Sequence, residues 1–394
     1  MLLRMEFVAQ SSRFDAVGGT SALPNNVLRL DRDRWSPERA RRWYDQQPWF
    51  VGANYVPAYA INQIEMWQAE TFDPAAIARE LDWARDLGMN SMRVFLHDLL
   101  WRDDPAGFQS RIDQYLDIAA ERGIRSMVVL FDSVWHPEPR LGPQTAPISG
   151  VHNSGWVQSP HRDTLENPNE WLWLRDYVDG VVRAFGRDDR VAIWDVWNEP
   201  DNIFMGTLEH LQSPRKFELV AELLPQVFSW VRAADPLQPL TSAVWHNHDW
   251  RWGPMLNTIE QTQLGESDVI SFHNYEWPEK FEARIGQLSE YGRPIFCTEW
   301  LARSVGSLVE TVLPVAHQHR VSMYNWGLVA GRSQTVFPWD SWKTPWMPET
   351  AGEEHPPVWF HDLLRPDGTP YRAAEANIFR MLASQPAAQM TARA

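Results

Sequence analysis

The chain is predicted to fold as an α/β protein, a closed (β/α)8 barrel. Short apolar segments alternate eight times with segments of helical periodicity, as in repeated strand–helix units. Most of these apolar segments are nearly continuous, as parallel strands buried on both faces are. The sequence has no G-x-G-x-x-G turn, which disfavours a doubly wound open sheet. The predicted strands are 50–55, 91–96, 126–132, 191–198, 240–245, 269–275, 295–300 and 322–328.

Helix-end signals support these units. Asp73 is a suitable N-cap, Pro74 stands at the first helical position, and Gly88 supplies the C-terminal stop of the first predicted helix. Gly186 ends the third in the same way. After the first, the predicted helices are 108–122, 170–185, 216–234, 255–264, 280–291, 308–319 and 371–382.

A barrel of this kind can occupy most of a 394-residue chain as one domain. We therefore expect a single catalytic barrel over residues 48–385. Residues 1–47 lack clear periodicity, and their mixed charges predict an N-terminal arm or a solvated lead-in helix. Residues 386–394 are expected to form a C-terminal tail.

Composition narrows the classes of partner. A formal net charge of -15 repels phosphate backbones and anionic lipid, so neither nucleic acid nor a membrane is an expected partner. Cys297 is the only cysteine, which excludes an internal disulfide and fits a reducing compartment. The first residues lack the apolar run of a secretory signal, so a cytoplasmic protein is expected.

The chain contains 23 tryptophans. Most single tryptophans in proteins serve packing. Together, however, so many indoles favour a carbohydrate partner, because their faces stack on the apolar C–H face of sugar rings.

Two predicted connections are much longer than typical strand-to-helix loops. Residues 133–167 follow the third strand and residues 329–369 follow the eighth, and both are rich in Trp, His and Pro. Both lie on the C-terminal face of the barrel, where active sites of this fold are found. We expect them to shape a substrate cleft.

Two glutamates end opposing strands. The fourth strand runs into Asn198-Glu199-Pro200, and the seventh contains Glu299-Trp300. Strands four and seven of a closed barrel face each other across the mouth, so their terminal side chains converge. Two carboxyls about 5–5.5 Å apart can cleave a glycosidic bond, one protonating the leaving oxygen while the other attacks the anomeric carbon.

At these strand ends the sequence resembles clan-A glycoside hydrolases, most closely family 5 and the cellulase-like group around it. The resemblance implies that Glu199 is the acid/base and Glu299 the nucleophile of a retaining reaction. Further matching positions are Arg93 on the second strand, His273 and Tyr275 in His273-Asn274-Tyr275 on the sixth, and Trp326 on the eighth.

The resemblance also implies roles for these side chains. Asn198 would donate to the sugar 2-OH, a contact that strengthens in the transition state. Arg93 and Tyr275 would keep Glu299 ionised. The plainer alternatives are that Arg93 forms an ion pair at the barrel mouth and that Tyr275 is a buried core phenol. His273 would bridge substrate hydroxyls or the acid/base, and Trp326 would floor the subsite of the cleaved sugar.

The pattern departs from the family at the third strand. The usual His in Asp-x-His is missing, and the chain reads Phe131-Asp132-Ser133-Val134-Trp135-His136. Asp132 or His136 is expected to take over the substrate contact. Trp135, His246 and Trp300 complete the predicted substrate-binding residues.

Two other functions compete with hydrolysis by paired carboxylates. His246-Asn247-His248-Asp249 resembles the opening of a metal site, which would indicate a metal-dependent barrel hydrolase, but its usual partner ligands are missing. A sugar-binding barrel without turnover is the other alternative. The prediction is a hydrolase that needs no metal or cofactor and acts on a β-linked glycoside or short oligosaccharide, with a preference for exo action.

Overall fold

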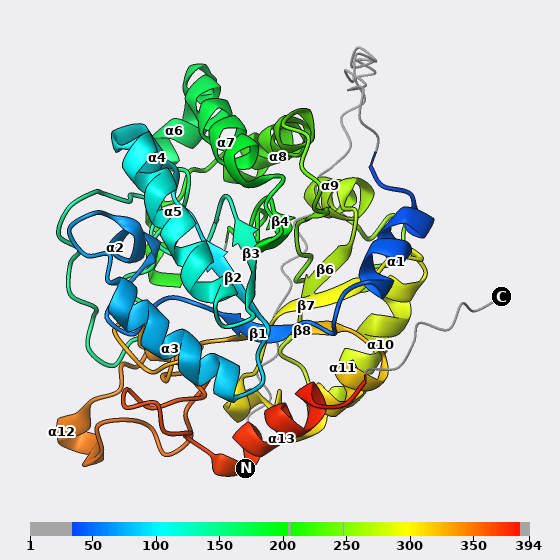
Figure 1. Ribbon diagram of the computed structural model, residues 1–394. Coiled ribbons are helices and arrows are strands. Elements are labelled where there is room, and N and C mark those ends of the chain that lie inside the picture. The colour runs from blue at the N-terminus through cyan, green and yellow to red at the C-terminus, as the bar shows by residue number, and fades with distance from the viewer. Residues whose placement is uncertain (1–33, 204–205, 247, 387–394) are drawn as a thin grey trace. The chain divides into compact units, whose positions relative to one another are not determined.

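The computed structural model describes residues 34–203, 206–246 and 248–386. The predicted tail from residue 387 onward and the first 33 residues of the predicted arm lie outside this part. Within it, eight parallel strands form the barrel (Figure 1). They are β1 (Val51–Asn54), β2 (Ser91–Phe95), β3 (Arg125–Val129), β4 (Val191–Asp195), β5 (Leu240–Thr241), β6 (Ile270–His273), β7 (Ile295–Trp300) and β8 (Ser322–Trp326).

The strand order is β5-β4-β3-β2-β1-β8-β7-β6, so every strand except β5 neighbours the next in sequence, and β1 pairs with β8. The remaining seam, between β5 and β6, is bridged by a parallel pair between Val244 and Phe272. The predicted (β/α)8 barrel is therefore confirmed.

Each strand is followed by a helix of the outer ring at the predicted place (Figure 1). These helices are α3 (Pro74–Asp86), α5 (Pro105–Ala120), α7 (Trp171–Phe185), α8 (Lys216–Ala233), α9 (Thr258–Glu266), α10 (Pro278–Ser289), α11 (Val309–Gln318) and α13 (Ala373–Ala383). Helix α9 begins three residues later than predicted, because Asn257 and Glu260 form a capping box there. Short additional helices are α2 (Gln63–Trp67), α4 (Asp98–Asp103), α6 (Arg162–Glu166) and α12 (Pro348–Ala351).

Helix α1 (Pro37–Asp45) precedes the barrel and packs against it. Ser36 caps it, and Ala40 and Tyr44 are buried while Arg39 and Arg42 are exposed. The Tyr44 hydroxyl lies 2.7 Å from Ser322 Oγ at the start of β8. This lead-in segment is thus amphipathic, with one face covering the N-terminal end of the barrel and the other solvated.

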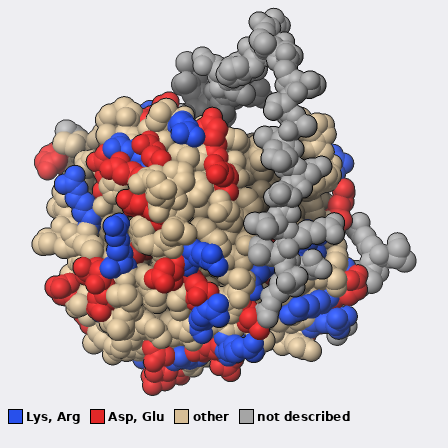
Figure 2. Space-filling model, turned by 90° about the horizontal axis from the view of Figure 1, so that it is seen from above, with Lys and Arg blue, Asp and Glu red and all other residues tan. Residues whose placement is uncertain are grey.

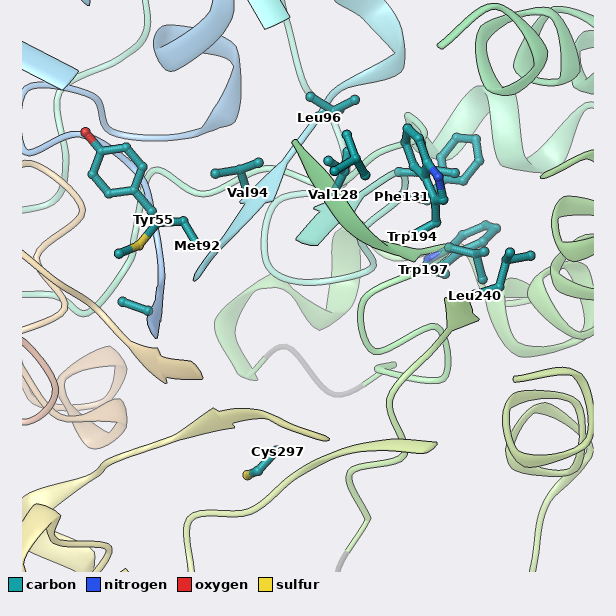
Figure 3. Close-up of a cluster of buried hydrophobic side chains, with 14 of the residues drawn as sticks. Tyr55, Met92, Val94, Leu96, Val128, Phe131, Trp194, Trp197, Leu240 and Cys297 are labelled. Carbon is teal, nitrogen blue, oxygen red and sulfur yellow. The ribbon is translucent and has the colours of Figure 1, made fainter. Parts of the chain in front are cut away.

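The main core lies between the strands and the outer helices. Figure 3 shows Phe131, Trp194, Trp197 and Leu240 gathered together, with Val94 contributed by the neighbouring part of the barrel. Trp67, Trp194, Trp197, Trp250 and Trp300 are all fully buried. Much of the tryptophan enrichment therefore serves packing, at roughly 1.5–3 kcal/mol for each large buried side chain.

The outer surface shows mixed charge. Figure 2 shows Lys and Arg side chains interspersed with Asp and Glu over one face of the molecule. Among the described residues, no helix is long and apolar enough to cross a membrane.

Candidate active site

A buried arginine organises the mouth of the barrel. Arg93 has no exposed side-chain surface, and its Nε donates to Asp195 Oδ2 at 3.0 Å. Its Nη1 donates to Asn54 Oδ1 at 2.6 Å and to Glu299 Oε1 at 3.2 Å. Its Nη2 donates to Asn198 Oδ1 at 2.6 Å. One guanidinium therefore fixes side chains from β1, β4 and β7.

The charge of Arg93 is compensated inside the protein. Burial opposes the charged form, but Asp195 and Glu299 together hold the pKa of Arg93 above its ordinary value. Burial also raises the pKa of Asp195, and the guanidinium opposes that rise. With the two charged atoms 2.9 Å apart, the pair is ionised and electrically balanced.

Glu299 is brought to the barrel interior by an irregularity in β7. The strand register shifts between Phe272 and His273 on β6 and between Cys297 and Trp300 on β7, so Glu299 pairs with His273. A bulge of this kind re-aims side chains beside active sites. Glu299 then accepts hydrogen bonds from Arg93 and, at Oε2, from the Tyr275 hydroxyl at 2.8 Å.

Glu199 stands just beyond β4 in a left-handed backbone conformation, with φ 42°. This region is unfavourable for a residue with a Cβ and persists where surrounding contacts impose it. Asn202 Nδ2 donates to Glu199 Oε2 at 2.7 Å, and His273 Nδ1 lies 2.8 Å from Oε1. The carboxyl group is thus held at both oxygens.

The two glutamates face each other across a short gap. One oxygen of each carboxyl and one nitrogen of His273 all lie within 4.8 Å of one another. Burial raises the pKa of both carboxyls, to about 7 in each case. Two adjacent like charges disfavour double ionisation, so the pair shares a proton near neutral pH.

The neighbours decide which carboxyl keeps that proton. Arg93 and the Tyr275 hydroxyl both stabilise the ionised form of Glu299. Among the described residues no arginine contacts Glu199; burial and Asp201 raise its pKa, while the hydrogen bond from Asn202 opposes that rise. Glu299 thus has two direct contacts that stabilise its ionised form, whereas Glu199 has a neighbouring carboxyl that opposes ionisation.

His273 is neutral in this position. Burial lowers its pKa to about 4, and its Nδ1 lies 3.5 Å from Glu299 Oε2 as well as close to Glu199. When Nε2 carries the ring proton of the neutral imidazole, Nδ1 can accept a hydrogen bond from the protonated Glu199 carboxyl. It therefore supports a protonated Glu199 without adding charge.

The altered end of the third strand builds an internal support. Asp132 Oδ1 accepts from Asn198 Nδ2 at 3.0 Å, and Oδ2 accepts from Trp156 Nε1 at 2.6 Å. Asp132 is 1% exposed. Its carboxylate thus orients the asparagine beside the acid/base candidate and one tryptophan of the long loop.

Trp326 belongs to an aromatic cluster next to this support. Its ring lies edge-on to Phe95 at 5.8 Å and to Trp156 at 5.6 Å. Tyr275 and Trp135 pack against the same cluster. The rings of β2, β8 and the loop after β3 form one apolar wall beside the carboxyl pair.

Three predicted residues lie outside the central network. The placement of Trp300 beside the substrate was wrong: its side chain is fully buried and packs on Phe379 of α13. The bulge that turns Glu299 inward turns the next residue to the outer face. His136 Nδ1 accepts from the Glu138 backbone N–H, and Trp135 stacks on Trp342 at 4.9 Å.

The histidines after β5 each contact a different carboxylate. His246 Nε2 lies 2.9 Å from Asp201 Oδ2, and His248 Nε2 lies 2.9 Å from Glu260 Oε1. Neither belongs to a group of three close metal-ligand atoms among residues 34–203, 206–246 and 248–386. His246 instead flanks the Glu199 side of the site through Asp201.

Four residues of the network were not predicted from the sequence. Asn54 and Asp195 bind Arg93, Trp156 binds Asp132, and Asn202 binds Glu199. A polar residue inside an apolar strand was an available signal for Asn54 and Asp195, because such groups are buried only with a partner. Trp156 and Asn202 lie in loops, and their contacts had no signal in the linear pattern.

Comparison of structures confirms the predicted resemblance to glycoside hydrolase family 5 for the fold. No protein-family model matches the chain, and no curated protein sequence is significantly similar to it. The chain is similar to an exo-β-1,4-mannosidase, Op5Man5, from Opitutaceae bacterium strain TAV5, with TM-score 0.53 and 18% identity over 85% of this chain. It spans 59% of the length of that enzyme.

Two further matches cover more of the compared protein. A GH5_18 enzyme from Streptomyces cattleya in complex with Manβ1-4GlcNAc gives TM-score 0.57 and 16% identity, covering 86% of this chain and 82% of the other. A β-glucosidase, 1317, gives TM-score 0.54 and 14% identity, covering 84% and 98%.

Proposed function

We propose that the protein is a retaining glycoside hydrolase acting on a β-linked glycoside or short oligosaccharide. The observation that carries this proposal is that one carboxyl oxygen of Glu199 and one of Glu299 lie within 4.8 Å of each other. Retaining enzymes hold their carboxyl groups about 5–5.5 Å apart, whereas inverting enzymes leave about 6.5–9.5 Å for a water molecule. The short gap supports direct attack by one carboxylate.

In the first step, a Glu299 oxygen bonds to the anomeric carbon while the bond from that carbon to the leaving oxygen breaks. Glu199 transfers its proton to that oxygen, so the aglycone departs as a neutral alcohol. Arg93 and Tyr275 aim the attacking carboxylate. Asn198 Nδ2 donates one hydrogen to Asp132, which leaves its second hydrogen for the sugar 2-OH.

In the second step, the now ionised Glu199 removes a proton from water. The water oxygen bonds to the anomeric carbon, and the ester bond to Glu299 breaks. This second inversion releases the sugar with the configuration it had in the substrate, and both carboxyls return to their starting protonation.

The comparisons suggest where a substrate search begins. The matched structures include an exo-β-1,4-mannosidase, an enzyme holding Manβ1-4GlcNAc and a β-glucosidase. We propose β-mannosides and β-glucosides as the first substrates for testing. Both present an equatorial leaving group to the same pair of carboxyls.

The experiment is a panel of nitrophenyl glycosides, including furanosides, with the anomeric product followed by NMR. We expect release of the retained anomer, loss of turnover in Glu299→Gln, and azide rescue of Glu199→Ala with activated substrates. Glu310→Gln, an exposed residue of α11, is the matched control and should behave as wild type. Full activity in Glu299→Gln would disprove the assignment.

A metal-dependent reaction is the second candidate, because Glu199, His273 and Glu299 could present three ligand atoms to one ion. Arg93 disfavours it, since its buried guanidinium already supplies a cation 3.2 Å from Glu299. Treatment with a chelator should leave the rate unchanged. Loss of activity that is restored by a divalent cation would favour the metal candidate instead.

A further inference from the structure

The two long loops at the barrel mouth are joined to each other. Figure 1 shows the segment after β3 and the segment carrying α12 on the same side of the barrel. In the sheet, β1 and β2 separate β3 from β8, so the loops meet by passing over those two strands. We call this junction, residues 148–156 with residues 331–346, the clasp.

The clasp is held by backbone as well as side-chain hydrogen bonds. The N–H of Asn153 donates to Ser333 O at 3.0 Å, and the N–H of Trp346 donates to Gly150 O at 3.0 Å. His152 binds both Ser341 Oγ and Phe337 O across the junction. A Cβ on Gly150 would lie 1.9 Å from Trp346 O, so the two backbones are in direct contact. Such a junction is a fixed wall.

A narrow recess lies between the clasp and the end of the barrel. Trp326, Trp156 and Phe95 line one part of it. Polar groups from the clasp and the chain beyond it line the other, namely Asn153, Ser333, Thr335 and Asp362. Asn54, which binds Arg93, is also in its lining, so the recess adjoins the carboxyl pair.

Two polar side chains in this recess have unused hydrogen-bonding capacity. Asn153 is 1% exposed, and neither its amide oxygen nor its amide nitrogen has a hydrogen-bond partner among the described residues. Asp362 is fully buried; its Oδ2 accepts from Thr335 Oγ1 at 2.8 Å, while its Oδ1 has no hydrogen-bond partner in the part of the chain that the structure describes. Leaving such groups unpaired is costly, so their arrangement indicates that a polar ligand group completes them.

The position of the recess identifies which part of a substrate it meets. The leaving group must lie beside the proton donor Glu199, whose neighbours Asn202, Asp201 and His246 are at β4 and β5. The sugar that becomes bonded to Glu299 therefore extends the other way, toward Trp326 and β1. On that side the clasp closes the cleft, and the recess is the space that remains in front of it.

We propose that the clasp closes the cleft behind a single sugar and that Asn153 and Asp362 bind a hydroxyl-bearing substituent of that non-reducing terminal residue. The inference rests on the proposed glycosidase function and deepens it to exo action. The recess has a free volume of about 20 Å³, which admits one small polar group and no second sugar ring, so it selects a chain end.

The first test is the product pattern on β-1,4-linked manno- and gluco-oligosaccharides labelled at the reducing end. Release of monosaccharide from the unlabelled end, one residue at a time, is the expected result. Internal cleavage products overturn the inference while leaving the hydrolase function intact. If no glycoside is hydrolysed, the proposed function fails instead. The binding test below then shows whether Asn153 and Asp362 bind a sugar hydroxyl.

The second test measures binding without turnover, in the Glu299→Gln background. The added variant is Asn153→Gly, because Asn153 has φ 48° and glycine adopts this conformation without strain. Calorimetry measures the dissociation constants of nitrophenyl β-mannoside, β-glucoside and their monodeoxy analogues. Comparing these constants with and without Asn153 gives the coupling free energy between that side chain and each hydroxyl. Asn169→Gly, at an exposed asparagine, is the control.

We expect one deoxy position to weaken binding by about tenfold with Asn153 present and to have little further effect in Asn153→Gly. Asp362→Asn should show coupling at the same position. An equal loss for all analogues overturns the inference, because Asn153 would then make no contact with a particular hydroxyl. Binding of none of the analogues overturns it as well, because the recess would then receive no substrate group.

Discussion

Arg93 and Asp195 form an ion pair of 2.9 Å in which neither side chain is exposed to solvent. The pair lies beneath the two candidate catalytic carboxyls, and Arg93 contacts Glu299 from it. Removing one partner of a buried ion pair destabilises the fold, because it leaves an uncompensated charge in a low-dielectric surrounding. Asp195 thus acts on the site through Arg93.

Asp195→Asn should lower the free energy of unfolding by about 3 kcal/mol, because the Arg93 charge loses its nearest counter-charge. Urea unfolding followed by fluorescence measures this. The control is Asp179→Asn, whose partner Arg183 is 60% exposed, and we expect a change of no more than about 0.5 kcal/mol. Equal effects of the two substitutions would contradict the role given to burial.

Tyr275→Phe should reduce kcat/KM by about tenfold or more and move the acidic limb of its pH profile to higher pH. The hydroxyl donates to Glu299 at 2.8 Å and thereby lowers the pKa of that carboxyl. Without it the pKa rises, so the nucleophile is already protonated at a higher pH. Tyr291→Phe removes a hydroxyl bound to Trp250 O and serves as the control. An unmoved acidic limb would exclude this effect of Tyr275.

Asn202→Ala should act on the opposite limb. The proton donor must be protonated, so kcat/KM falls as pH rises through the pKa of Glu199, which burial raises to about 7. Asn202 opposes that rise by donating to the carboxylate, and its removal should shift the alkaline limb upward. Asn377→Ala, exposed on α13, is the control. A shift of the alkaline limb to lower pH would contradict the proposed effect of Asn202 on the pKa of Glu199.

Gln334→Asn tests the clasp. The Gln334 amide donates to Val151 O and Ile148 O and accepts from the Gly150 N–H, and asparagine tolerates its φ of 57° but is too short for these contacts. We expect a loss of about 1–3 kcal/mol in unfolding free energy and a raised KM with kcat nearly unchanged. Gln318→Asn, exposed at the end of α11, is the control. Unchanged stability and KM would show that the clasp does not depend on this amide.

The sequence alone determined the barrel, because apolar runs, helix caps and stop signals are local properties that repeat eight times. It also placed Glu199 and Glu299 at opposing strand ends, since topology follows from strand count in a closed barrel. The resemblance to glycoside hydrolase family 5 implied that Arg93 and Tyr275 would serve Glu299, and the structure brings these side chains into contact.

Only the tertiary structure decided which way each terminal side chain points. Strict alternation along β7 was interrupted between Cys297 and Trp300, so Glu299 turned inward and Trp300 outward, and no local signal marks that shift in register. The pairing of Asp132 with Trp156 and the junction at Asn153 likewise join segments that are distant in sequence. Contacts of this kind depend on how the loops pack, which local periodicity does not encode.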